Sequence, residues 1–261
     1  MAVLHTEQRG RVLVLTIDDP ATRNALGPDI YKAGAAALRR AAEDSAIGAV
    51  VLTGAGTTFS SGGNLNRLAG LRAGAPETVC AGIDGLHGFV QAIRSCPKPV
   101  IAAVEGGAAG AGFSVMLACD LVVAARGARF VMAYVKVGLS PDGGATAFLA
   151  QTLPRQLAAE LALEGGVVDA GRLHQAGIVN AVCEPGAALG TALARAATLA
   201  AGPGQAMASI KGLLNAAYAD GLGTQLDRER DSFVANLFHA DAGEGIAAFR
   251  EKRQAVFGGV G

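Results

Sequence analysis

Residues 98–130 read KPVIAAVEGGAAGAGFSVMLACDLVVAARGARF, and their pattern decides the fold. The apolar run Pro99–Val104 predicts a buried strand, Gly110–Ala118 predicts a short apolar helix, and Leu121–Ala124 predicts another strand. The turn Gly106–Ser114 between the first strand and the helix is rich in glycine, so its backbone N–H groups are accessible. The start of the helix adds the positive end of its dipole. We therefore expect a strand–turn–helix–strand unit whose turn can bind an oxygen atom.

The alternation of strand and helix continues on both sides of this unit. From Pro154 onward helical patterns dominate, apart from a short strand near Ile178–Val182. Asp169 is expected to cap a helix that runs to Gln175 and is stopped by Gly177. The other expected elements are strands at Arg11–Ile17 and Ala49–Thr53, helices at Pro28–Asp44 and Thr78–Arg94, and a mobile surface loop at Gly70–Pro76.

Composition excludes several classes of protein. The 261 residues include 22 Lys and Arg against 22 Asp and Glu, with 51% hydrophobic and 17% charged residues. This balance argues against intrinsic disorder and against nucleic acid as the main partner. It favours one large α/β domain, alone or with a small appendage, whose apolar excess lies in subunit interfaces. We expect an oligomer.

Cysteine spacing and the N-terminus add further exclusions. The four cysteines have no C-x-x-C spacing and no accompanying histidines, which predicts neither a zinc site nor a disulfide framework. Glu7 and Arg9 interrupt any signal peptide. Val100–Cys119 is the most membrane-like stretch, but Glu105 and several glycines indicate a buried core element. We expect a cytoplasmic protein with no metal, no cofactor and no membrane contact.

Two further motifs are candidates for chemistry. The turn Phe59–Leu65 (FSSGGNL) is also glycine-rich and follows a strand, so it and Gly106–Ser114 are each either a close-packed connection or half of an oxyanion hole. Neither turn matches a nucleotide-binding fingerprint. The segment Val137–Gly144 (VGLSPDGG) places Asp142 in a rigid turn, where it either serves the turn alone or points into a pocket.

Taken together and in order, LTGAGTTFSSGGNL, the stretch from Lys98 to Phe130 and VGLSPDGGAT resemble the crotonase (enoyl-CoA hydratase/isomerase) superfamily over roughly residues 10–257. The resemblance implies an α/β fold, a crotonase-like spiral of β-β-α units with a helical C-terminal trimerisation region. It divides the chain into a spiral core (1–200) and C-terminal helices (201–261). It also implies a homotrimer or hexamer and an acyl-CoA thioester as substrate.

The resemblance assigns catalytic roles by position. The two oxyanion-hole donors fall on the backbone N–H groups of Gly63 and Ala111. Hydratases of the family carry two glutamates where this chain has Ser114 and Tyr134, so efficient hydration is not expected. Isomerases of the family carry an acidic residue in a P-[DE]-x-G turn, and Asp142 occupies that position. One carboxylate suffices to move a proton between two carbons.

Substrate-binding positions also follow from the resemblance. Near the reacting group, Ser114 and Tyr134 are expected to contact the acyl chain. Phe249 and Lys252 match positions that reach CoA, sometimes from a neighbouring subunit, although a core aromatic and a surface charge explain them equally well. His87, His174 and His239 are interpreted as structural or exposed. The expected lining of the nucleotide and pantetheine channel is Arg23, Ala25, Leu26, Ser61 and Gly63.

The sequence therefore predicts an enoyl-CoA double-bond isomerase. The alternative is an enoyl-CoA hydratase, or another crotonase chemistry, with an atypical base. A third possibility is a non-catalytic relative that binds RNA through a lysine-rich helix. The matching helix here carries only Lys32, Arg39 and Arg40, so no nucleic-acid partner is expected.

Overall fold

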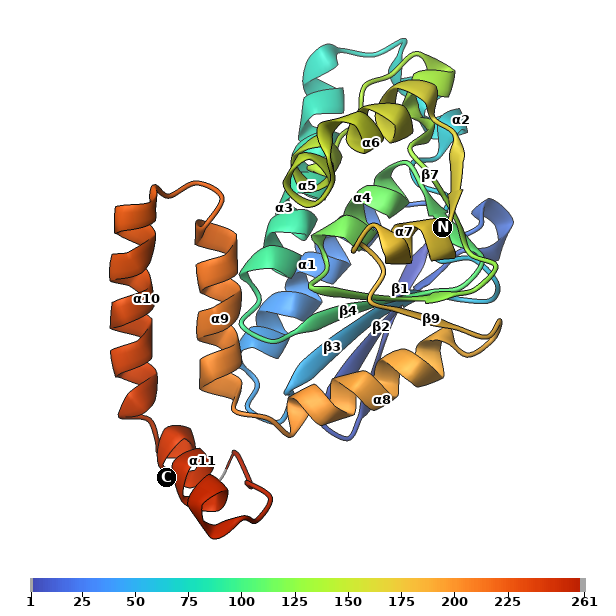
Figure 1. The fold of residues 1–261 in the computed structure, drawn as a ribbon. Coiled ribbons are helices and arrows are strands. Elements are labelled where there is room, and N and C mark those ends of the chain that lie inside the picture. Colours follow the sequence, from blue (N-terminus) through green and yellow to red (C-terminus); the bar gives the residue numbers. More distant parts are fainter. Residues whose placement is uncertain (1, 259–261) are drawn as a thin grey trace.

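The computed structural model describes residues 2–258, and these form a six-stranded main sheet with the strand order β1-β2-β3-β4-β6-β9 (Figure 1). β1 is antiparallel to β2, and every other neighbouring pair is parallel. β3 and β4 are buried along their whole length, which explains why they read as continuous apolar runs. The strands are β1 (Val3–Arg9), β2 (Val12–Asp18), β3 (Ala49–Gly54), β4 (Val100–Val104), β6 (Leu121–Ala125) and β9 (Ala181–Cys183).

A second, three-stranded sheet lies beside the main one. It consists of β5 (Gly107–Ala109), β7 (Arg129–Val131) and β8 (Val167–Asp169), with β7 in the centre. β5 forms inside the glycine-rich turn that follows β4, and it pairs in parallel with β7. Gly107 has φ +148°, and a Cβ atom there would lie 2.0 Å from the carbonyl oxygen of Arg129. Glycine is therefore required for this pairing.

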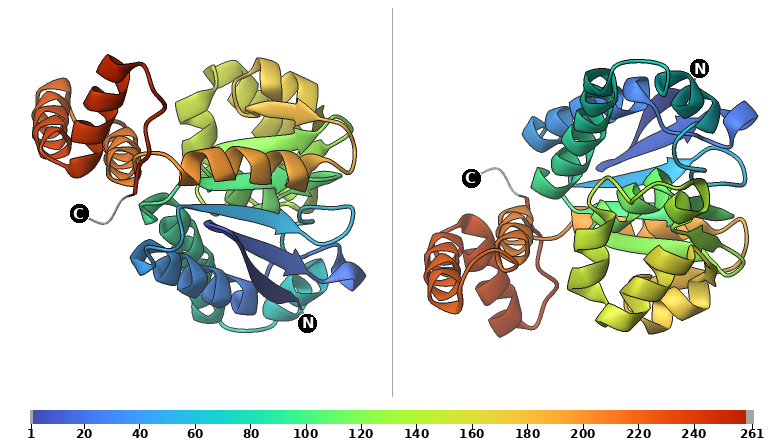
Figure 2. Two further views of the ribbon diagram at one scale, coloured as in Figure 1. Left: turned by 90° about the horizontal axis from the view of Figure 1, so that it is seen from below. Right: turned by 90° about the horizontal axis from the view of Figure 1, so that it is seen from above.

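Helices cover both faces of the main sheet (Figures 1 and 2). α8 packs an alanine stripe against β3, β4 and β6 on one face. On the other face α1 and α3 pack together so closely that a Cβ at Gly34 would lie 2.4 Å from the ring of Phe89. The α-helices are α1 (Pro28–Glu43), α2 (Leu65–Leu71), α3 (Pro76–Ser95), α4 (Ala111–Ala118), α5 (Ala145–Thr152), α6 (Arg155–Ala159), α7 (Ala170–Gln175), α8 (Ala188–Ala200), α9 (Gly204–Ala216), α10 (Leu222–Leu237) and α11 (Ala240–Glu251). Short helical turns are η1 (Pro20–Thr22), η2 (Ala133–Val137) and η3 (Glu160–Glu164).

The last three helices project to one side of the sheet core in every view (Figures 1 and 2). An ion pair anchors α9, because Lys211 Nζ lies 2.6 Å from Asp120 Oδ2 and donates to the carbonyl oxygen of Ile93 at 2.8 Å. Large apolar side chains are exposed along these helices, including Ile210, Leu214, Leu226, Phe233, Phe238 and Phe249. The helical C-terminus is as predicted. The division at residues 200 and 201, and the role in trimerisation, stay predictions.

The α/β fold class is confirmed, with small differences in the elements. Asp169 caps α7 as expected, since its Oδ1 accepts from the N–H of Arg172 at 2.8 Å. The strand predicted near Ile178–Val182 begins only at Ala181. The N–H groups of Ile178 and Val179 instead donate to the carbonyl of Leu173 and close the end of α7.

Other elements were missed or placed differently. β1 was not predicted, because it is mostly exposed and shows no clear alternation. β5, β7 and β8 were too short to detect. α2 extends into the predicted loop Gly70–Pro76 as far as Leu71. Within residues 2–258, none of the helices combines the length and apolar character needed to cross a membrane.

Candidate active site

The two glycine-rich turns lie directly against each other. The N–H of Ala109 donates to the carbonyl of Ser60 at 3.0 Å, and Ser60 and Ala108 form a parallel bridge. Gly62 has φ +88°, and a Cβ there would lie 2.4 Å from the carbonyl oxygen of Ala109. Only glycine allows this approach, so the sequence of the two turns determines their contact.

The loop before α1 is hydrogen-bonded to the first glycine-rich turn and to the segment that precedes it. Asn24 is 1% exposed, and its Nδ2 donates to the carbonyl oxygens of Ala55 at 2.9 Å and Thr58 at 2.6 Å. Ser60 Oγ donates back to the carbonyl of Asn24 at 2.8 Å. The N–H of Leu26 donates to the carbonyl of Gly62 at 2.7 Å. These bonds leave the first glycine-rich turn little freedom to move.

Two backbone donors are left open by this arrangement. Within residues 2–258, neither the N–H of Gly63 nor that of Ala111 donates to a protein acceptor. Both residues line the same cavity, and Ala111 is the first residue of α4. Free N–H groups at a helix start, in a buried setting, can hold a negatively charged oxygen.

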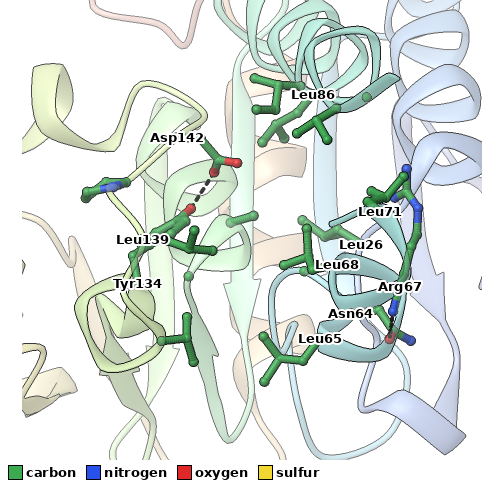
Figure 3. Close-up of a pocket in the computed structure, with 18 of the residues that line it drawn as sticks. Leu26, Asn64, Leu65, Arg67, Leu68, Leu71, Leu86, Tyr134, Leu139 and Asp142 are labelled. Atoms are coloured by element: carbon green, nitrogen blue, oxygen red, sulfur yellow. Dashed lines mark hydrogen bonds between the residues drawn. The ribbon is translucent and has the colours of Figure 1, made fainter. Parts of the chain in front are cut away.

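Asp142 lines the cavity and is hydrogen-bonded to Tyr134 (Figure 3). Its Oδ1 accepts from the hydroxyl of Tyr134 at 2.5 Å, and the same hydroxyl lies 3.1 Å from Ser114 Oγ. Burial and the nearby charge of Asp142 raise the pKa of Tyr134 well above its usual range. Tyr134 therefore stays protonated at neutral pH and serves as a donor. Gly143 and Gly144, with φ +60° and +80°, form the turn that directs the carboxylate.

The cavity has a volume of about 570 Å³, within the roughly 300–1,000 Å³ typical of small-molecule sites. Asp142 is the single carboxylate among the described residues that line it. Opposite Asp142 and Tyr134, the wall formed by α2 and α3 is mainly apolar (Figure 3). Its apolar members are Leu65, Leu68, Leu71, Val79, Ile83 and Leu86. An apolar chain can lie there while a polar group meets the two open N–H donors.

Known proteins resemble this chain in sequence and in fold. The family model described as enoyl-CoA hydratase/isomerase matches residues 7–260. The chain belongs to this family. It is therefore an acyl-CoA enzyme of the crotonase type, and the resemblance seen in the motifs is confirmed.

Relatives in the enoyl-CoA hydratase/isomerase family carry both activities in their names. A 1,2-epoxyphenylacetyl-CoA isomerase of Escherichia coli (strain K12) is 37% identical over 249 residues, covering 95% of each chain. A 2,3-dehydroadipyl-CoA hydratase of the same strain is 34% identical over 260 residues, covering 99% of this chain and 100% of the other. The solved enoyl-CoA hydratase from Polaromonas sp. JS666 has a TM-score of 0.95 and 53% identity, covering 97% of this chain and 98% of the other.

The structure brings together most of the residues that the sequence pointed to. The cavity is lined by Leu26, Ser61, Gly63, Ala111, Tyr134 and Asp142. Ser114 does not line the cavity and lies behind Tyr134. Arg23 and Ala25 stand just before Leu26 and are not part of the lining, although the carbonyl of Arg23 accepts from the N–H of Ser61 at 3.0 Å.

Phe249 and Lys252 lie elsewhere in this chain. Phe249 is on α11 and 86% exposed, and Lys252 ends that helix, which is remote from α2 and α3 (Figure 1). Neither residue lines the cavity. A contact with CoA from a neighbouring subunit stays a prediction.

Three polar residues of the cavity lie outside the sequence motifs and were not expected. Tyr31 on α1, Arg67 on α2 and His87 on α3 all line it. His87 was interpreted as structural or exposed, and its side chain is 50% exposed, but it also contributes to the lining. No motif marks these residues, because only the packing of α1, α2 and α3 decides which side chains reach the cavity. Within residues 2–258, no group of histidine, cysteine and acidic side chains is arranged to hold a metal ion.

Proposed function

We propose that this protein is an enoyl-CoA double-bond isomerase. The observation that carries the proposal is that Asp142 is the single carboxylate among the described residues of the cavity. Hydration needs one group to activate water and another to protonate carbon, whereas isomerisation needs one group that accepts and returns a proton. The family's two hydratase glutamates are replaced by Ser114 and Tyr134, and Ser114 lies outside the lining.

In the proposed reaction, Asp142 removes a proton from carbon 2 of a 3-enoyl thioester. The C–H electron pair enters the conjugated system, and the thioester oxygen becomes an enolate oxygen. The N–H groups of Gly63 and Ala111 hold that oxygen, each contributing about 3–4 kcal/mol of transition-state stabilisation. Asp142 then returns the proton to carbon 4, so the double bond ends between carbons 2 and 3.

Tyr134 is suited to support this step as a positioning residue. Its hydroxyl donates to Oδ1 of Asp142, and among residues 2–258 no donor bonds to Oδ2. One carboxylate oxygen is therefore held in place while the other is open to take the proton. The raised pKa of Tyr134 supports this role, because the phenol keeps its proton at the pH of catalysis.

A hydratase that uses an atypical base is the second candidate. Support for it comes from the 53% identity to the Polaromonas protein, which is named as an enoyl-CoA hydratase. In that case Asp142 would activate water and a second group would supply the proton. A non-catalytic RNA-binding role has no comparable support.

We also propose a homotrimer or hexamer, which the exposed apolar side chains of α9–α11 support. A cytoplasmic location is part of the same proposal. In such an assembly Phe249 and Lys252 would reach the CoA of a neighbouring subunit. The proposal includes no metal or redox cofactor. Sedimentation as a stable monomer at micromolar concentration would contradict the assembly.

The decisive experiment assays isomerisation of 3-hexenoyl-CoA and hydration of crotonyl-CoA separately. We expect the wild type to isomerise efficiently and to hydrate poorly. Asp142→Asn keeps the shape of the side chain but removes its basicity, so kcat for isomerisation should fall by about 10²-fold or more. The Kd for hexanoyl-CoA, which cannot isomerise, should stay within about threefold of the wild type. The N–H groups of Gly63 and Ala111 still hold the thioester oxygen in this variant.

Ser114→Ala serves as the control, since it removes a hydroxyl that does not line the cavity and should cost far less. The isomerase assignment is wrong if Asp142→Asn retains wild-type isomerisation. It is also wrong if the wild type hydrates crotonyl-CoA faster than it isomerises 3-hexenoyl-CoA.

A further inference from the structure

The polar side chains of the cavity differ in whether they have hydrogen-bond partners within the protein or in solvent. Tyr134 donates to Asp142, and Ser61 Oγ donates to the carbonyl of Thr22 at 2.7 Å. Asn64 caps α2 by accepting from the N–H of Arg67 at 3.1 Å. Arg67 and Ser140 are exposed to solvent, and the side chain of His87 is half-exposed. Water satisfies these last three without any ligand.

Tyr31 is the exception. It is 7% exposed and lines the cavity, yet within residues 2–258 its hydroxyl has no hydrogen-bond partner. The oxygen is not sealed in the protein interior, because it is absent from the fully buried atoms that lack a partner. It therefore meets the cavity itself. An apolar group bound against this hydroxyl would displace its water and leave it unpaired, which costs free energy, whereas a bound acceptor would satisfy it.

Tyr31 lies in the first turn of α1 and next to α3. Its N–H donates to the carbonyl of Gly27 at 3.0 Å in the first turn of α1, and its Cδ2 would lie 3.5 Å from a Cβ at Gly85 of α3. The ring therefore lies beside the backbone of α3, and little of the residue is exposed. Burial, with the charge of Asp142 as a second cause, raises the pKa of Tyr31 to about 12. It is a donor throughout the physiological range.

We propose that Tyr31 is a specificity-determining residue, and that its hydroxyl donates a hydrogen bond to an oxygen atom in the acyl group of the substrate. The preferred substrates are acyl-CoA thioesters whose acyl part carries an ether, epoxide, carbonyl or hydroxyl oxygen beyond the thioester. This inference deepens the proposed function and rests on it for the identity of the cavity as the acyl site.

A buried donor in a mainly apolar cavity discriminates between acyl groups. An acyl group with a suitably placed oxygen satisfies the hydroxyl, whereas a hydrocarbon chain of the same shape displaces water and leaves the donor unpaired. The other lining side chains that lack a protein partner are exposed and lose less, because solvent still reaches them. Preference for an oxygen-bearing acyl group should thus depend on Tyr31 above every other side chain of the cavity.

The test measures binding, by calorimetry, of two pairs of acyl-CoA esters in which an oxygen replaces a methylene group. One pair is phenoxyacetyl-CoA and 3-phenylpropionyl-CoA, and the other is (2-methoxyphenyl)acetyl-CoA and (2-ethylphenyl)acetyl-CoA. In at least one pair, the wild type should bind the oxygen-bearing member about five- to tenfold more tightly, the worth of one hydrogen bond. Tyr31→Phe should remove that preference by weakening the oxygen-bearing member alone.

Tyr218→Phe is the matched control. Tyr218 is 58% exposed and lies outside the cavity, so its replacement should leave the preference intact. Thermal denaturation of each variant confirms folding. The inference is overturned if the wild type shows no preference in either pair, if the preference survives in Tyr31→Phe, or if that variant weakens both members equally. Since none of these esters needs to react, a failure of the isomerase proposal, seen in turnover with Asp142→Asn, is distinguishable from a failure here.

Discussion

The two walls of the cavity are built in different ways. One wall consists of the two glycine-rich turns and the segment that ends at Asp142, and it is held by backbone hydrogen bonds and by buried Asn24 and Ser60. The other wall consists of α2 and the first half of α3. Leu65, the first residue of α2, is 58% exposed. The first wall presents the N–H donors of Gly63 and Ala111 and the carboxylate of Asp142. The second presents mainly apolar side chains (Figure 3).

The glycines of the two walls differ in how closely other backbone atoms approach them. A Cβ at Gly62 or Gly106 would lie 2.4 Å and 1.9 Å, respectively, from a backbone oxygen, and both residues have positive φ. A Cβ at Gly70 on α2 would meet nothing within 4 Å. Close backbone contacts therefore fix the glycine-rich turns, whose N–H groups must hold the developing negative charge of the thioester oxygen at a defined position. Gly70 of the apolar wall makes no such contact.

The largest expected effect comes from removing a donor of the rigid wall. Ala111 is the first residue of α4, where proline is tolerated, so Ala111→Pro deletes the N–H while the helix is retained. We expect kcat for 3-hexenoyl-CoA to fall by about 10²- to 10³-fold, as for loss of one oxyanion-hole donor. Steady-state kinetics measures this, and the melting temperature reports the fold.

Ala111→Ser is the control for that variant, because it changes the side chain but keeps the N–H. Its kcat should stay within about tenfold of the wild type. Equal activity of the proline and wild-type proteins would show that this N–H takes no part in the reaction.

A smaller effect is expected when one methyl group is added to each wall. Gly62→Ala places a Cβ against the carbonyl of Ala109 at positive φ and should lower the free energy of unfolding by about 2–4 kcal/mol. Gly70→Ala fills open space in a helix and should raise it by up to about 1 kcal/mol. Urea denaturation measures both values. Similar values for the two variants would remove the distinction between the walls.

The smallest effect is expected from reshaping the apolar wall. Leu68 is half-buried, and its Cδ1 would lie 3.7 Å from a Cβ at Gly63, so it packs beside one of the open donors. Leu68→Ala enlarges the cavity and should shift the ratio of kcat/KM toward long or branched 3-enoyl-CoA substrates by less than about tenfold. A loss of kcat as large as that of Ala111→Pro would assign this wall a part in the chemistry.

Local sequence determined much of the rigid wall. Asn24, Gly62 and Gly106 have positive φ, which few residue types other than glycine and asparagine adopt. Ser60 is buried and hydrogen-bonded in close contact with the second turn, where a larger side chain would not fit. The turn around Asp142 is specified in the same way by its proline and two glycines. For that reason the motifs, their order and the carboxylate could be recognised in the sequence, together with the family and the α/β class.

The apolar wall and the selectivity of the cavity depended on tertiary structure. Tyr31 sits on an amphipathic helix, and nothing in its sequence context distinguishes it from a core aromatic. Its position beside the cavity depends on the packing of α1 against α3, which approach closely at Gly34 and Phe89. Arg67 and His87 likewise line the cavity through the placement of α2 and α3. Turn chemistry is local and can be read along the chain, whereas helix packing joins residues far apart in sequence, and no local pattern encodes it.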